Sequence, residues 1–233
     1  MKFFVLKVLL FFDFFHKNKI LRVLKKLLVE EEKIIFDVGG HNGESVKLFN
    51  KHFKPCKIYT FEPLEKNFFK LKTNTKNISD KVTYFNFALG DKKEKKPIKE
   101  MIETSSSTLN DINENSNYFR KKKFFLGVKK NEKMFLEKNV FIEKGANIIK
   151  KFKINKIDLL KIDTEGYEFN VIKGFGKNIK KIDLILFEHH YDLMIKKKYT
   201  FKDINRYLIS EGFKLKYKFK MPLRKTFEYI YTK

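Results

Sequence analysis

A glycine-rich turn with one acidic residue follows an apolar run early in the chain, in the stretch FDVGGHNGE (residues 36–44). Asp37 closes the apolar run, and the glycines after it let backbone N–H groups approach a ligand at the end of a strand. A carboxylate there would repel a pyrophosphate but attract a sulfonium or ammonium group. Glu44 and Ser45 also stand where a phosphate-binding Walker loop would have Lys and Ser or Thr. The turn therefore predicts a cationic nucleoside without phosphate.

A second acidic residue, Glu62, ends the next apolar run, CKIYTFEP (residues 56–63). At the end of a second parallel strand, an acid can accept hydrogen bonds from both hydroxyls of a ribose. NAD-binding domains use the same position, so Glu62 alone does not discriminate between nucleosides. Together with Asp37 it favours S-adenosylmethionine, with Asp37 nearer the amino-acid end of the donor and Glu62 on its ribose.

Alternating apolar and helical patterns place these motifs on a parallel sheet. The first part of the chain is predicted to form strand, helix, strand, helix and strand over residues 33–40, 44–53, 56–63, 64–76 and 81–91. This order is typical of a doubly wound α/β fold. Regularity lapses over about residues 91–155, which we interpret as an insertion with short elements of its own. Further strands and helices and a terminal hairpin are predicted over residues 156–168, 169–179, 181–190, 200–212, 213–219 and 224–233.

Five segments resemble successive motifs of the FkbM-type methyltransferases, in the same order over about residues 33–190: DVGGHNGE, YTFEPLEKNFFKL, NFALGD, SSST and DLLKIDTEGYEFNVIKG. The best-known signature of that family, K-I-D-x-E-G-x-E, is present from Lys161 to Glu168. The turn commonly reads D-V-G-A-N-x-G there, so Gly40 and His41 depart from the pattern. The resemblance implies S-adenosylmethionine as donor and a class I, Rossmann-like fold with a seven-stranded sheet. It also implies a hydroxyl acceptor on a sugar, polysaccharide or secondary metabolite.

The resemblance extends the predicted donor site beyond the two acids. The segment ALGD would lie against the adenine, and the serines at 105–107 would add a contact to the cofactor or substrate, although ordinary turns and polar loops also have such sequences. The residues predicted to bind the donor are Asp37, Gly39, Gly40, His41, Asn42, Gly43, Glu62, Pro63, Ala88, Leu89, Ser106 and Asp163.

Methyl transfer to an aliphatic hydroxyl benefits from a general base, because the hydroxyl is a weak nucleophile. Two late strands end in suitable side chains, and we predict Asp163, Glu165 and His190 as catalytic residues. The two acids would share a task, one holding the acceptor or the methionine part of the donor while the other takes the proton. Asp163, Glu188 and a histidine would also make a plausible metal-binding set, but we expect no metal. Lys161, in mid-strand, is expected to pair with a nearby acid.

The chain is strongly basic, with 52 Lys and Arg against 28 Asp and Glu and a net charge of +24. Such an excess is typical of proteins that bind nucleic acid or anionic membranes. Only four of the basic residues are arginines, and Lys, Phe, Ile and Asn belong to A/T-rich codons, which favours compositional drift as the cause. The single cysteine, Cys56, excludes a disulfide framework and a thiolate metal cluster, and it fits a reducing, cytoplasmic compartment.

The first 29 residues are predicted to form a leader helix ahead of a methyltransferase domain over residues 30–233. Lys7 and Asp13 interrupt its apolar start, which is shorter than the roughly 18–20 apolar residues of a spanning helix. No small-residue cleavage site follows it, which argues against a secretory signal. Ile20 and Leu24 share one helical face, so the helix is expected to pack on the domain or on a second copy in a homodimer. Peripheral docking at the inner face of the membrane is the alternative.

Other functions compete with sugar methylation. Amino-group methylation of bases usually shows an Asn/Asp-Pro-Pro-aromatic run where this chain has DTEGY. Methylation of cytosine C5 requires a Pro-Cys pair at that same place, whereas the one Pro-Cys pair of this chain comes much earlier, ahead of the second strand. Methylation of an RNA ribose 2′-hydroxyl stays open, although a nucleic-acid partner is not what we expect. A catalytically silent, membrane-associated binding protein with the same fold and an NAD-dependent oxidoreductase are the remaining alternatives.

Overall fold

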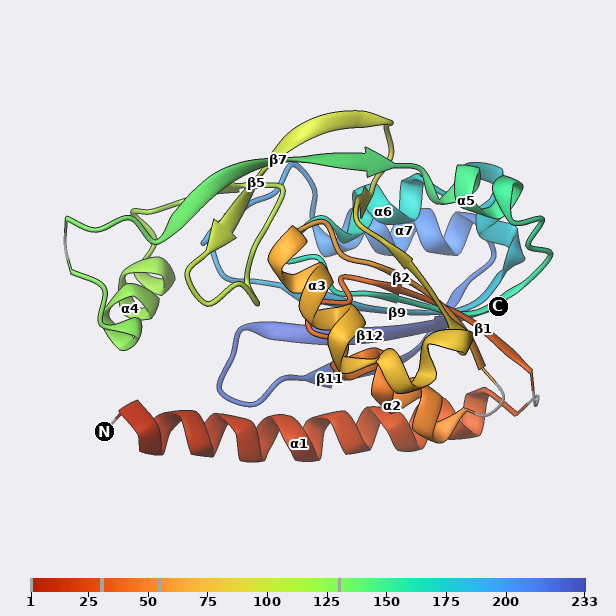
Figure 1. Ribbon diagram of the computed structural model, residues 1–233, viewed down its shortest axis with the longest axis horizontal. Helices are drawn as coiled ribbons and strands as arrows, with labels where there is room; N and C mark the ends of the chain where they lie inside the picture. The colour runs from red at the N-terminus through yellow and green to blue at the C-terminus, as the bar shows by residue number, and fades with distance from the viewer. Residues whose placement is uncertain (1, 30–31, 54–55, 130) are drawn as a thin grey trace.

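The computed structural model describes residues 2–29, 32–53, 56–129 and 131–233, with side chains from residue 15 onward apart from residue 56. A seven-stranded sheet in the order β11-β12-β9-β8-β1-β2-β3 forms its centre (Figure 1). Its strands are β1 (Lys33–Val38), β2 (Cys56–Phe61), β3 (Val82–Phe85), β8 (Ile157–Ile162), β9 (Ile182–His190), β11 (Lys214–Lys220) and β12 (Thr226–Thr232). Strands β1, β2, β3, β8 and β9 run parallel, and β11 and β12 form an antiparallel hairpin at one edge. The predicted α/β class and terminal hairpin are confirmed.

The parallel strands are nearly continuous apolar runs because helices cover both faces of the sheet. On one face α2 (Glu44–His52) and α3 (Glu65–Asn74) contribute Val46, Phe49 and Leu71 to a buried cluster. On the other face Ile148, Val171 and Ile204 belong to a second, larger cluster. They come from the helices on that face, α5 (Gly145–Lys151), α6 (Glu168–Lys173) and α7 (Phe201–Ser210). Two 3-10 helices, η1 (Lys76–Lys81) and η2 (Gly176–Lys181), lead into β3 and β9.

The leader segment forms one long helix, α1 (Lys2–Leu27), along the face that carries α2 (Figure 1). Ile20, Leu21 and Leu24 are buried in the same cluster as Phe219 of β11 and Ile230 of β12. The apolar face predicted from Ile20 and Leu24 therefore packs on the edge of the sheet. Among the described residues, no helix combines the length and apolarity that crossing a bilayer requires.

A second layer lies outside the main sheet, and most of it comes from residues 91–155, which we interpret as an insertion. It consists of a three-stranded sheet in the order β4-β7-β5, a two-stranded sheet of β6 and β10, and helix α4. Their bounds are β4 (Ala88–Leu89), β5 (Glu94–Met101), β6 (Asp111–Ile112), α4 (Asn117–Leu126), β7 (Phe135–Glu143) and β10 (Ile195–Lys196). The single strand expected over residues 81–91 was wrong, because β3 ends at Phe85 and β4 leaves the main sheet to pair with β7. The side chain of Asn86 donates to the carbonyl of Glu62 at 2.9 Å and fixes this turn.

Candidate active site

The parallel strands end around one large cavity of about 1310 Å³. Gly39 follows β1, Glu62 follows β2, Asp163 follows β8 and His190 ends β9, and all four line the cavity. The remaining walls come mainly from α1, α2, α3, α4, the β4–β6 segment and the β11–β12 turn. Ligand sites of open α/β sheets lie at this carboxyl edge, and the volume exceeds the roughly 300–1,000 Å³ of a typical small-molecule pocket. The cavity therefore has room for more than one ligand.

The glycine turn depends on its glycines because it lies directly against the acidic loop after β8. Gly39 has a φ of 87°, and a Cβ added to it would lie 1.9 Å from the carbonyl oxygen of Asp163. A Cβ on Gly40 would lie 2.3 Å from Thr60 Oγ1. The backbone N–H of His41 donates to a carboxylate oxygen of Glu62 at 2.9 Å. The turn therefore links the ends of β1, β2 and β8 with no side chain of its own between them.

Asp37 does not face the cavity, contrary to its predicted role at the amino-acid end of the donor. Its side chain is fully buried, and Oδ2 accepts a hydrogen bond from Ser45 Oγ at 2.6 Å. Its Oδ1 lies 3.2 Å from Nζ of Lys161, the residue paired with it in register across β1 and β8. Gly43 also stays off the cavity wall, since it caps the N-terminus of α2 and lies against Leu71. The other residues predicted to bind the donor line the cavity.

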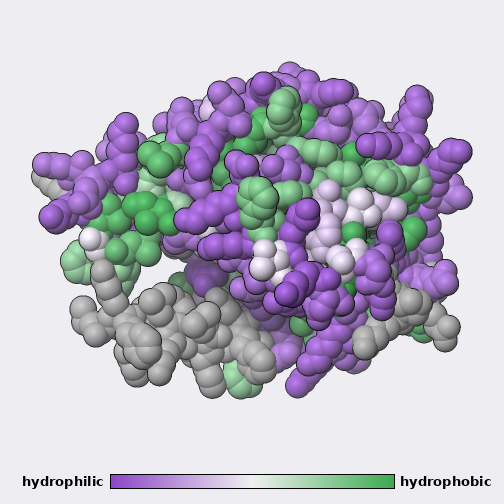
Figure 2. All heavy atoms as spheres, in the orientation of Figure 1, coloured by the Kyte–Doolittle hydropathy of each residue, from purple (hydrophilic) through white to green (hydrophobic). Residues whose placement is uncertain are grey.

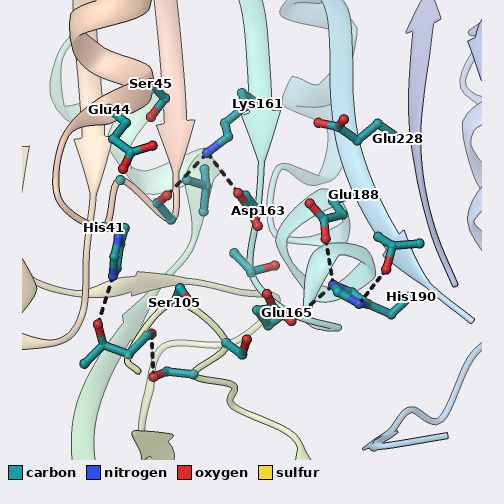
Figure 3. Close-up of a pocket in the computed structure, with 18 of the residues that line it drawn as sticks. His41, Glu44, Ser45, Ser105, Lys161, Asp163, Glu165, Glu188, His190 and Glu228 are labelled. Carbon is teal, nitrogen blue, oxygen red and sulfur yellow. Dashed lines mark hydrogen bonds and ion pairs between the residues drawn. The ribbon is translucent and has the colours of Figure 1, made fainter. Parts of the chain in front are cut away.

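Lys161 forms the expected ion pair and connects the turn to the acidic loop (Figure 3). Besides Asp37, its Nζ lies 3.5 Å from Oδ2 of Asp163 and 3.4 Å from the carbonyl oxygen of Gly39. Burial alone would lower the pKa of Lys161, but Asp37 and Asp163 raise it above its usual range. Lys161 is therefore a permanent cation that neutralises Asp37. Asp163, whose side chain is 41 % exposed, keeps its carboxylate at the cavity surface.

Glu62 presents a carboxylate at the end of β2 as predicted. It accepts hydrogen bonds from the backbone N–H groups of His41 and Leu64 at 2.9 and 3.0 Å. Burial raises the pKa of Glu62 to about 7, although these hydrogen bonds oppose the shift. Asn67 lies beside it, and the Oδ1 of Asn67 has no hydrogen-bond partner among the described residues. Both residues line the cavity, so this corner combines a carboxylate with one acceptor that has no partner among the described residues, as ribose hydroxyls require.

His190 lies at the centre of a group of carboxylates (Figure 3). Its Nε2 is 3.1 Å from Oε2 of Glu165 and 3.0 Å from Oε1 of Glu188. Its Nδ1 is 3.5 Å from Oδ2 of Asp192 and 3.2 Å from Thr226 Oγ1. Burial alone would lower the pKa of His190, but Glu165, Asp192 and Glu188 raise it well above its usual value. The imidazole is therefore protonated and balances the surrounding carboxylates.

Glu165 is the group of this cluster whose proton affinity is best matched to neutral pH. Its side chain is only 13 % exposed, and burial raises the pKa of Glu165 to about 8 even though His190 opposes the shift. Its backbone has a φ of 48°, and its carbonyl accepts a hydrogen bond from Thr108 Oγ1 at 2.6 Å. Asp163 and Glu165 were expected to share a task. In the structure Asp163 instead pairs with Lys161, and Glu165 pairs with His190.

The residues that could bind a metal in the structure differ from those considered from the sequence. One ligand atom each from Glu165, Glu188 and His190 could hold a metal ion, because these atoms lie within 4.8 Å of one another. Asp163 is not part of this set. A protonated His190 already supplies positive charge between the two glutamates, so the cluster is compatible with a site that has no metal.

Sequence reasoning missed Glu228, which lines the cavity and is paired in register with Glu188 across β12 and β9. Burial raises the pKa of Glu228, and its carboxylate contacts the imidazole of His16 on α1. The sequence feature that could have indicated Glu228 is an acidic residue within the largely aromatic and apolar sequence TFEYIYT of β12. His189, by contrast, points to the other face of β9, where it contacts Glu168. This follows from the alternation of side chains along a strand.

Serine and lysine side chains on the second layer complete the wall opposite the acidic loop. Lys122 of α4 donates to Ser106 Oγ at 2.5 Å and lies 2.6 Å from Oε1 of Glu103. Thr104 Oγ1 is 2.9 Å from Nε2 of His41, which ties this wall to the glycine turn. The predicted contact residue Ser106 therefore lies on the cavity and is held by a lysine that the sequence did not single out.

Comparison with known proteins gives a family and a fold. The family described as "Methyltransferase FkbM domain" matches residues 37–215. The METTL16 MTase domain is similar in structure, with a TM-score of 0.53 and 11% identity over 93% of this chain and 67% of that chain. TrmK of M. capricolum, solved with its natural cofactor product S-adenosyl-homocysteine, has a TM-score of 0.50 and 11% identity over 91% of this chain and 67% of that chain. At such identities the structural likeness shows the fold alone. No curated protein matches the chain in sequence.

Proposed function

We propose that this chain, which belongs to the FkbM methyltransferase family, methylates a hydroxyl group of a sugar, a glycan or a related metabolite. It has the class I methyltransferase fold, and S-adenosylmethionine is its cofactor. When bound, this cofactor supplies an electrophilic methyl group on a positively charged sulfur. The observation that carries the proposal is a cavity that joins a corner with acceptors for ribose hydroxyls, at Glu62 and Asn67, to the buried carboxylate of Glu165, which can accept a proton.

The residues present fit such a donor. Gly39 and Gly40 leave the backbone of the turn open to the cavity, because neither position has room for a Cβ. Glu62 and the unpartnered Oδ1 of Asn67 would accept hydrogen bonds from the ribose hydroxyls. Ala88 and Leu89 line the cavity with small and apolar side chains beside this corner, as an adenine ring requires. Asp163, partly exposed at the end of β8, would hold the positively charged end of the donor.

Glu165 would take the proton of the acceptor hydroxyl. A general base works best with a pKa near the working pH, and burial raises the pKa of Glu165 to about 8. His190 is a poor base because the neighbouring carboxylates keep it protonated. Its imidazolium, 3.1 Å from Oε2 of Glu165, would instead orient that carboxylate. Glu165 and His190 thus form the catalytic pair, with Asp163 as the residue that positions the reactants.

Titration calorimetry and a labelled-donor assay would test this function. The purified chain should bind S-adenosylhomocysteine and transfer label from the donor to sugars, sugar nucleotides or cell-envelope glycans. Asp163→Asn should abolish turnover while the protein stays folded, and Asp183→Asn, on a 48 % exposed side chain, serves as the control. Normal turnover in Asp163→Asn, or no affinity for S-adenosylhomocysteine in the folded wild type, would refute the proposal.

Methylation of an RNA ribose is the second candidate, since the net charge of +24 favours a polyanionic partner. The hydroxyl chemistry of the site would be the same. Transfer of label to RNA in preference to sugars, with an RNA affinity that falls steeply as salt rises, would favour this candidate. A non-catalytic binding protein is distinguished by donor affinity without transfer to either class.

A further inference from the structure

The outer end of the cavity is bordered by exposed apolar side chains on two separate elements. At the C-terminal end of α4, Phe124 and Phe125 are 72 % and 53 % exposed, and Leu126 follows at 37 %. On the β11–β12 turn, Leu223 is 73 % exposed. Phe125, Leu126 and Leu223 line the cavity, so these residues border a single opening. Figure 2 shows the apolar side chains gathered over α4, beside a hollow. We call this set, Phe124, Phe125, Leu126 and Leu223, the apolar rim.

Basic side chains accompany the apolar rim on both elements. Arg120 and Lys121 are exposed on α4, and Lys225 is exposed beside Leu223. Arg224 follows Leu223 on the same turn and lines the cavity. One of the four arginines in the chain thus lines this opening, and a second, Arg120, is exposed on the helix that carries Phe124. A drift toward A/T-rich codons, the interpretation favoured for the lysines, would not by itself enrich arginine.

Helix α1 runs along the same side of the opening. His16 and Lys17 of α1 line the cavity together with Phe125, Leu126 and Leu223 of the apolar rim. In Figure 1 the N-terminal end of α1 lies on the same side of the molecule as α4. The sequence of that end, KFFVLKVLLFF, is apolar with interspersed lysines. Two elements distant in sequence, α4 and the β11–β12 turn, therefore present apolar and basic side chains at one end of the fold, and the N-terminal end of α1 lies on the same side.

We propose that this end of the molecule docks on the surface of an anionic lipid bilayer, with the apolar rim inserted among the lipids and the basic residues on their phosphates. Peripheral proteins bind membranes through this combination of buried apolar area and attraction to anionic lipids. Docking in this way turns the mouth of the cavity toward the bilayer. A second copy of the chain fits less well, because a two-fold interface would set the same basic residues against each other.

Vesicle sedimentation of the full-length chain tests the docking without reference to methyl transfer. The wild type should bind vesicles of phosphatidylglycerol and phosphatidylcholine, and should bind less to phosphatidylcholine alone and at high salt. The double variant Phe124→Ser/Leu223→Ser removes the two most exposed apolar side chains of the rim. It should lower the partition coefficient by about tenfold or more, since the inserted apolar area sets the affinity.

The matched control is Leu136→Ser/Ile209→Ser, at side chains that are 62 % and 56 % exposed and lie off the cavity wall. Its partition coefficient should equal that of the wild type, and the unfolding midpoints of both variants should stay close to that of the wild type. Three outcomes would overturn the proposal. They are a wild type that does not bind the anionic vesicles, equal binding by both double variants, and self-association that depends on the rim in the absence of vesicle binding.

Discussion

Replacing Glu165 with Gln tests the assignment of the proton-accepting group. Gln keeps the size of the side chain but cannot take a proton, and removal of a general base typically costs about 10²- to 10⁴-fold in rate. The wild-type rate should rise with pH until it levels off above about 8, because burial raises the pKa of Glu165 to about 8 and only the ionised form accepts a proton. Glu165→Gln should lose both the rate and this dependence. Its affinity for S-adenosylhomocysteine should change little, since we propose that Glu62 and the glycine turn, and not Glu165, bind the nucleoside.

The same substitution should change how stability depends on pH. The pKa of Glu165 is raised from 4.5 to about 8 on folding, so the folded protein keeps a proton that the unfolded chain releases. The stability contributed by this group is therefore lost as pH rises from about 4.5 to 8. A shift of 3.5 (8 minus 4.5) corresponds to at most about 5 kcal/mol at 1.36 kcal/mol for each pKa unit. Gln cannot ionise, so the variant should lose less stability than the wild type between pH 5 and pH 8.

Kinetics at several pH values and urea unfolding at pH 5 and pH 8 measure both effects. Glu211→Gln, at the end of α7 and away from the cavity wall, is the control and should match the wild type in both assays. Wild-type turnover in Glu165→Gln would refute the assignment of the base. An unchanged difference in unfolding free energy between the two pH values would refute the reasoning about burial.

Three further changes probe the surrounding structure. Gly39→Ala should cost at least about 1–3 kcal/mol in unfolding free energy and abolish S-adenosylhomocysteine binding, because the new Cβ would meet the carbonyl of Asp163 at 1.9 Å. Lys161→Met should cost about 3–5 kcal/mol by urea unfolding, because it leaves Asp37 buried without a counter-charge; a smaller loss than in a surface Lys→Met control would contradict the pairing. Dialysis against EDTA should leave methyl transfer unchanged, because a protonated imidazole already balances the buried carboxylates; recovery of a lost rate by Mg²⁺ would show a metal requirement.

The order of elements in the parallel half of the sheet was predictable because each signal is local. Short apolar runs ended by Gly39 or Pro63, with helical spacing between them, define strands whose carboxyl ends share one edge. The position of Glu62 and Asp163 at that edge therefore follows from the sequence without information on how the elements pack. The structure of residues 81–91 could not be predicted from local signals. There β4 leaves the main sheet to pair with β7, which comes some fifty residues later in the chain.

The direction of an acidic side chain depends on the neighbouring strand and could not be read from its own segment. The sequence placed Asp37 at the end of β1 but could not show that Lys161 stands beside it in register on β8. A lysine in a buried strand needs a counter-charge, so it pairs with the nearest carboxylate, which then does not face a ligand. Glu228 was missed for a similar reason, since its position opposite Glu188 arises only when the terminal hairpin reaches β9.

The charge states of the site are a step further from the sequence, because they depend on how many carboxylates surround each cation. Alternation along β9 places Glu188 and His190 on the cavity face, and the adjacency of β8 and β9 brings Glu165 to the same imidazole. An isolated histidine there would be the obvious base. With Asp192 added on the other side of the ring, the imidazole holds its proton and the buried Glu165 becomes the group that exchanges one near neutral pH. The catalytic role that we propose for Glu165 thus depends on the composition of the cluster rather than on residue type alone.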